Sequence, residues 1–274
     1  MIRCAFVCAL AGLPLLGQSA SGDQGMNLYS AEKEVALGRQ LAAEYRERTT
    51  AIPSGGVQQY IESLGQKLSA QAPRTTLGFT FGVIADDPCP TIHEPAALPG
   101  GYVFVPAALL LAAQDEAEFA GMLAHAMAHI IERHDTQAAT RGQLMQSVST
   151  PVLFMGSSTG CASPIALPLG LLTMQRTFER QADLLAVQVM AQAGFDPNAL
   201  VRYIKRVQSS ESATPAVFSP LPTRDQRVAG MLSAIAKLPV SRYGDSTDRA
   251  FEAARDEVRR FLPVNRAIAP SLRR

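Results

Sequence analysis

Two histidines, His125 and His129, stand four residues apart in an uninterrupted run of good helix formers from about Asp115 to His134. A helix turns by about 100° per residue, so this spacing leaves the two side chains about 40° apart on one face. Both imidazoles can then reach one ion at the roughly 2.0–2.1 Å that zinc requires. Polar side chains without a partner are costly in an apolar helix, so the pair predicts a metal-binding helix.

A later helix, predicted from Thr177 to Ala193, contains two acids four residues apart, Glu179 and Asp183. One interpretation is a solvated acidic face. The other makes Glu179 a third zinc ligand and Asp183 the group that orients a ligand histidine through its second ring nitrogen. Two histidines and a carboxylate leave the fourth position open, which is typical of a catalytic zinc site.

The composition of the 274-residue chain favours one large, mainly helical domain, alone or with an appendage. Hydrophobic residues make up 47% of it, which is ample for a core, whereas aromatic residues make up 6% and Trp is absent. The formal net charge is +1, so nothing favours a nucleic acid or another strongly charged partner.

The N-terminus has the pattern of an export signal. Arg3 gives the positive region, Cys4–Leu16 is a short apolar stretch, and small residues follow, so we expect a signal peptide over 1–22. The product is then exported, periplasmic or secreted, with an uncleaved anchor as the alternative. Cleavage would leave Cys89 and Cys161, and whether these two form a disulfide stays open.

Two short strands, Leu77–Ala85 and Tyr102–Val105, are predicted before the histidine helix, and Pro106 closes the second. A strand beside such a helix suits a peptide-binding cleft, because a free strand edge holds an extended substrate by backbone hydrogen bonds. An ordinary core strand is the alternative. The residues expected to contact a substrate are Gly101, Tyr102, Val103 and Phe104.

Residues 142–175 contain no charged side chain but include glycines and prolines, which argue against a straight transmembrane helix. We expect a hydrophobic hairpin or lid, buried against the core, covering the cleft, or in peripheral contact with a membrane or an unfolded client. Further helices are predicted from Ser30 to Arg48, and over 57–68, 198–207, 224–238 and 248–261.

Several short motifs accompany the histidine pair. In chain order they are Glu34-x-x-x-Gly38, Ala97–Val105, Glu116-x-Glu118, His125-x-x-x-His129 with Arg133-His134, Arg176-x-x-Glu179-x-x-Ala182-Asp183, Gly194-Phe-Asp-Pro197 and Pro222-x-x-x-x-Arg227. In this order and spacing they resemble the HtpX/Oma1/BepA-type family of zinc metalloendopeptidases, over about 29–238. The resemblance implies an α+β, mainly helical, zincin-like metallopeptidase domain with a small β-sheet beside the His-x-x-x-His helix.

The resemblance also implies a set of site residues. It assigns the ligands of one zinc ion (Zn²⁺) to His125, His129 and Glu179, and the orienting acid to Asp183. His134 matches a family histidine that is not a ligand, and we expect a structural role for it. The implied partner is a peptide or an unfolded envelope protein. We expect the metallopeptidase-like domain over 23–240 and a C-terminal helical tail over 241–274.

Three positions depart from the family pattern. Ala126 stands where the family has its general base, a glutamate; the segment Glu94–Ala97 replaces Asn-Ala-Phe-Ala; and Leu221 replaces a histidine that approaches the metal. A positioned base contributes about 10²–10⁴-fold to a rate and an oxyanion donor about 10²–10³-fold. We therefore predict a chain that is catalytically impaired or inactive.

Three functions stay open at this stage. The chain could be a working peptidase that uses Glu94 as a substitute base, a non-catalytic pseudoprotease that holds peptides or envelope proteins in its cleft, or a zinc-free relic. The origin of Ala126 is open as well, between an engineered inactivation and a natural replacement. The substitutions at Leu221 and Glu94–Ala97 favour the natural replacement.

Overall fold

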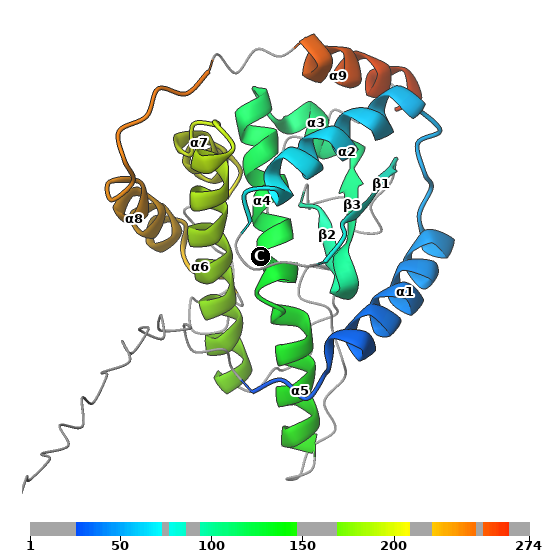
Figure 1. The fold of residues 1–274 in the computed structure, drawn as a ribbon, viewed down its shortest axis with the longest axis vertical. Coiled ribbons are helices and arrows are strands. Elements are labelled where there is room, and N and C mark those ends of the chain that lie inside the picture. The colour runs from blue at the N-terminus through cyan, green and yellow to red at the C-terminus, as the bar shows by residue number, and fades with distance from the viewer. Residues whose placement is uncertain are drawn as a thin grey trace, which may run out of the picture.

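The computed structural model describes residues 26–72, 77–85, 94–146, 169–208, 221–244 and 249–262, in which helices surround one small sheet (Figure 1). The predicted α+β, mainly helical class is confirmed. The helices are α1 (Ala31–Arg48), α2 (Gly55–Ser69), the 3-10 turn η1 (Pro99–Gly101), α3 (Ala107–Ala112), α4 (Glu116–Ile131), α5 (His134–Gln146), α6 (Leu169–Gln192), α7 (Asn198–Val207), α8 (Arg224–Ile235) and α9 (Arg249–Phe261). The predicted signal peptide, Cys89, Cys161 and most of the 142–175 stretch lie outside the described residues.

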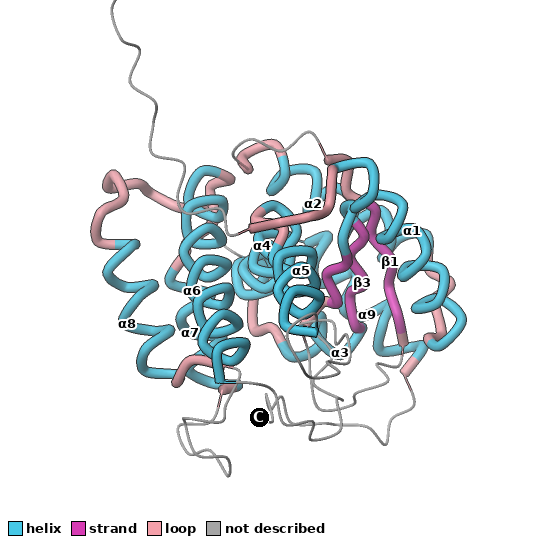
Figure 2. Tube along the Cα trace, turned by 90° about the horizontal axis from the view of Figure 1, so that it is seen from below, coloured by secondary structure: helices cyan, strands magenta, loops and turns pink. Residues whose placement is uncertain are grey.

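The sheet has the order β1-β3-β2, with strands β1 (Thr80–Ile84), β2 (Ala96–Leu98) and β3 (Tyr102–Pro106). It lies between α1 and α4 (Figure 2). β3 pairs in parallel with β1 and antiparallel with β2, so both of its edges are occupied. The expected free edge at Tyr102–Val105 is therefore wrong, because this apolar strand is the centre of the sheet. The outer strands are β1 and β2, and the sequence did not predict β2.

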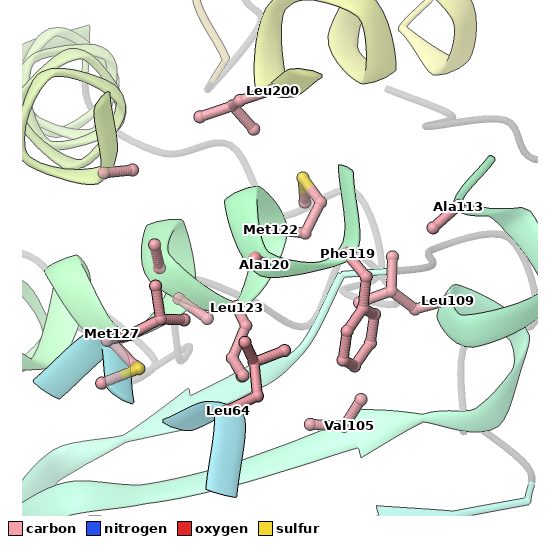
Figure 3. Close-up of a cluster of buried hydrophobic side chains, with 14 of the residues drawn as sticks. Leu64, Val105, Leu109, Ala113, Phe119, Ala120, Met122, Leu123, Met127 and Leu200 are labelled. Atoms are coloured by element: carbon pink, nitrogen blue, oxygen red, sulfur yellow. The ribbon is translucent and has the colours of Figure 1, made fainter. Parts of the chain in front are cut away.

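Helix α4 is the central element of the fold. Every side chain from Glu116 to Ile130 is buried, so the helix is covered on all sides, by α6, α7, α2 and the sheet. Figure 3 shows its Phe119 and Leu123 close to Leu64 of α2 and Val105 of β3. Packing of this density fixes the backbone that presents His125 and His129.

The central helix is shorter than predicted, because α4 ends at Ile131 and α5 begins at His134. Arg133 between them has φ 59°, a left-handed conformation that is uncommon outside glycine. Its guanidinium donates from Nε to Glu34 (2.5 Å) and from Nη2 to the carbonyl of Tyr29 (2.6 Å). These contacts with the start of α1 hold the turn that brings His134 back toward the site.

Helix α1 lies unusually close to the turn that leads into β3. A Cβ atom added at Gly38 would lie 1.7 Å from the carbonyl oxygen of Pro99, so only glycine allows this approach. Gly101, at the end of that turn, has φ 97°, which also favours glycine. The Glu34-x-x-x-Gly38 motif thus joins α1 to both the sheet and the α4–α5 turn.

Helix α9 packs into the same core as the elements before it. Phe251 and Val258 are fully buried, and the Phe251 ring lies 6.0 Å from Phe119 and 6.2 Å from Tyr60. The division between a domain over 23–240 and a tail over 241–274 stays a prediction. Among the helices in the described ranges, none has the length and apolar character needed to cross a bilayer.

Candidate metal centre

Helices α4 and α6 run side by side and bring the three predicted ligands together (Figure 1). The Nε2 atoms of His125 and His129 are 3.2 Å apart. Glu179 lies 3.5 Å from the first through Oε2 and 3.7 Å from the second through Oε1. Tetrahedral zinc with ligands at about 2.0–2.1 Å separates neighbouring donor atoms by about 3.3 Å, so one ion fits among these atoms.

The electrostatics of the cluster also fit a cation. Oε2 of Glu179 is buried and has no hydrogen-bond partner among the described residues, which is costly for a carboxylate. Burial disfavours a charged His125, but Asp183, Glu179 and Glu94 outweigh it and raise the pKa of His125 well above 6.5. Three acidic groups therefore create a negative potential at the point where the ring nitrogens meet, and a divalent cation would neutralise it.

Asp183 lies behind the first histidine, with Oδ1 3.0 Å from Nδ1 of His125. Arg227 of α8 donates two hydrogen bonds to this carboxylate, at 2.8 Å and 2.6 Å. Burial alone would raise the pKa of Asp183, but the Arg227 guanidinium outweighs it and lowers that pKa. The ionised carboxylate favours a proton on Nδ1, which leaves the Nε2 lone pair for the ion.

The sequence predicted the position of Asp183 but gave no role to Arg227. The signal was present in the Pro222-x-x-x-x-Arg227 motif, whose partner across the fold could not be inferred from spacing. A capping box between Thr223 and Gln226 fixes the start of α8 and so places Arg227 against α6.

Replacing Arg227 by methionine is expected to lower the free energy of unfolding by about 3–5 kcal/mol, because Asp183 would remain buried without its cation. Urea unfolding followed by circular dichroism, with metal removed, measures the change. The matched control is Arg259→Met, which breaks an exposed ion pair with Asp256 and should have little effect. Equal losses in the two variants would contradict a structural role for the buried pair.

His134 orients the second histidine. Its Nδ1 lies 3.2 Å from Nδ1 of His129, its Nε2 lies 3.1 Å from Oε1 of Gln181, and its ring stacks on Phe178. Burial and a neighbouring histidine lower the pKa of His129 to about 3 and of His134 to about 2, so both rings are neutral. Because Oε1 of Gln181 only accepts, the proton of His134 is on Nε2, and His129 donates from Nδ1. Nε2 of His129 is then free to bind an ion.

Ala126 follows the first histidine and is 2% exposed within the main hydrophobic cluster. Its methyl group can neither accept nor return a proton. The nearby acids of α4 have other partners, since Glu118 pairs with Arg206 and Glu116 accepts from the hydroxyl of Tyr60. Neither replaces the missing base.

Glu94, the predicted substitute base, lies beside the three candidate ligands, with Oε1 3.1 Å from Nε2 of His125.

The strand residues expected to contact a substrate do not line an open edge. Val103 and Phe104 are buried in the sheet, and the guanidinium of Arg46 on α1 lies over the ring of Tyr102. The prediction that these strand residues present a free edge to substrate is therefore corrected. Leu221 is partly buried at the start of the segment leading to α8.

A histidine pair on one helix, a carboxylate from a second helix and an adjacent small sheet define a zincin-like metallopeptidase domain. The sequence profile of Peptidase family M48 matches residues 56–235. The chain belongs to this family, which confirms the resemblance found in the motifs.

Named relatives agree with this assignment. The chain is 24% identical over 241 residues to the beta-barrel assembly-enhancing protease of Escherichia coli K12, covering 82% of this chain and 47% of the relative. The protein of that name from Yersinia pestis is 26% identical over 233 residues, which cover 79% of this chain and 46% of the relative. The mitochondrial metalloendopeptidase OMA1 of Schizosaccharomyces pombe is 32% identical over 156 residues, which cover 56% of this chain and 44% of the relative. The chain thus spans less than half the length of each.

Proposed function

We propose that this chain is an exported zinc-binding member of family M48 in which peptide-bond hydrolysis is impaired or lost. The observation on which this depends is Ala126, whose methyl group occupies the position of the family's general base beside an otherwise preserved ligand set. His125, His129 and Glu179 would hold the metal, while Asp183 and His134 fix the orientation of the two rings.

Zinc, when bound, polarises a carbonyl and lowers the pKa of the water it holds. The surrounding protein must still accept a proton during attack and return one to the leaving amine. Loss of the group that does this costs about 10²–10⁴-fold in rate. Replacement of the family histidine by Leu221 removes a further polar group, so both substitutions act toward a near-background rate.

We propose peptides or unfolded envelope proteins as the ligands of the cleft. The relatives named beta-barrel assembly-enhancing protease support this class of client, and the signal-like pattern over 1–22 supports export. Among the described strands, β2 pairs on one side only, so its other edge offers backbone groups for strand addition. This edge replaces β3 as the proposed binding edge.

The direct test is to purify the chain without added metal, measure its zinc content by mass spectrometry, and follow cleavage and binding of unfolded casein. We expect about one zinc per chain, casein binding by fluorescence anisotropy, and cleavage at background. Glu179→Gln is the matched variant and should lose the zinc. Casein cleavage that disappears with a chelator and in Glu179→Gln would show a working peptidase and overturn the proposal, as would a chain that binds no zinc.

A further inference from the structure

We infer that residues 26–30, here called the N-terminal strap, dock on α5 and thereby raise the zinc affinity of the metal centre, an inference that rests on the proposed function. Figure 1 shows this segment crossing α5 on its way into α1. Nδ2 of Asn27 donates to Oγ1 of Thr136 (2.8 Å), and the backbone N–H of Leu28 donates to Oγ1 of Thr140 (3.0 Å). Both threonines are fully buried, so the strap is part of the cover over this face of α5.

The contacts that hold the strap are mainly polar. The side chain of Met26 is 68% exposed and that of Leu28 is 56% exposed, so neither anchors the strap in the core. The hydroxyl of Tyr29 accepts a hydrogen bond from Gln143 at the surface of α5. Such bonds exchange for bonds to water at a small net cost. The strap can therefore leave α5 far more readily than the core unfolds, and its docked fraction can change.

The strap also reaches the turn between α4 and α5. The carbonyl of Tyr29 accepts from Nη2 of Arg133 (2.6 Å), and the buried carboxylate of Glu34 at the start of α1 accepts from Nε (2.5 Å). Arg133 has the left-handed φ of 59°, which persists in a residue with a side chain only where its surroundings hold it. When the strap leaves, Arg133 loses the carbonyl of Tyr29, and the turn is held less firmly.

The residue that follows this turn contacts the metal centre. Nδ1 of His134 lies 3.2 Å from Nδ1 of His129, and its Nε2 lies 3.1 Å from Oε1 of Gln181. A hydrogen bond to the second nitrogen orients a ligand histidine, and loss of such a partner typically weakens metal binding by about 10–100-fold. A less firmly held turn lets His134 move away from His129, so undocking of the strap weakens zinc binding.

The coupling is reciprocal, because it is a free energy shared by two equilibria. If docking of the strap raises the zinc affinity about tenfold, zinc favours docking by the same factor. The backbone N–H of Leu28 is bonded to Thr140 only in the docked strap. Zinc should therefore slow hydrogen exchange at Leu28 about tenfold, which NMR measures on the unchanged chain with zinc and with a chelator.

Two variants that leave the ligands unchanged test the zinc affinity. Asn27→Ala combined with Thr140→Val removes two hydrogen bonds between the strap and α5. Glu34→Gln replaces the carboxylate that pairs with Arg133 by a neutral amide. In competition with a chelating dye, each should bind zinc about tenfold more weakly than the parent. The matched control is Glu47→Gln, which changes an exposed acid on α1 and should bind as the parent does.

The outcomes separate this inference from the proposed function. A strap that only stabilised the fold would lower the melting temperature of the variants and leave their zinc affinity unchanged. Equal zinc affinity in the parent and both folded variants, or exchange at Leu28 that zinc does not slow, would thus overturn the inference and leave the proposed function standing. A parent that binds no zinc would overturn both. Circular dichroism checks the folding of each variant, and the exchange measurement needs no variant.

Discussion

Ala126→Glu is expected to raise the rate of casein hydrolysis by about 10²–10⁴-fold over that of the parent. The change restores a carboxylate at the position of the family's general base, beside a candidate metal centre whose three ligands leave the fourth position open. Initial rates of casein cleavage with stoichiometric zinc measure the effect.

Several controls make this result interpretable. Adding Glu179→Gln to Ala126→Glu should abolish the gained activity, which shows that the metal is required. Position 126 is buried, so thermal unfolding must confirm that the glutamate is tolerated. Because Leu221 still lacks the polar group of the family, the lower part of the range is expected. If Ala126→Glu folds and binds zinc but cleaves no faster than the parent, loss of the base is not what limits the rate.

The clustering of the candidate ligands could be predicted from sequence because helical periodicity places them in pairs on single helices. His125 and His129 share a face by their spacing, as do Glu179 and Asp183, and each pair lies on one helix. The two pairs come together once α4 and α6 pack side by side. The strongest signals in the chain were therefore those within a single regular element.

Other features depended on contacts far apart in sequence. The end of α4 follows from the left-handed Arg133, which is held by Glu34 99 residues away. Strand β2 has three residues, too few to show a period, and it gains its structure from pairing with β3. The same pairing brings the Glu94 carboxylate to the imidazole of His125. The sequence could therefore suggest Glu94 as a substitute base, but it could not predict how close Glu94 lies to His125.

Zinc is expected to raise the free energy of unfolding by about 4 kcal/mol at a free concentration about 1,000 times its dissociation constant. The physical reason is that the ion joins α4, through His125 and His129, to α6, through Glu179, and these groups converge only in the folded chain. Glu179→Gln should remove this stabilisation, because a neutral amide is a poor zinc ligand.

Urea unfolding followed by circular dichroism, with zinc or with a chelator, gives both free energies. In the chelator, Glu179→Gln should be at least as stable as the parent, because the substitution removes a buried carboxylate oxygen that lacks a partner among the described residues. Glu62→Gln, which changes an exposed acid on α2, should keep the full response to zinc. If zinc stabilises Glu179→Gln as much as the parent, the ion is held elsewhere, and the proposed joining of α4 to α6 is wrong.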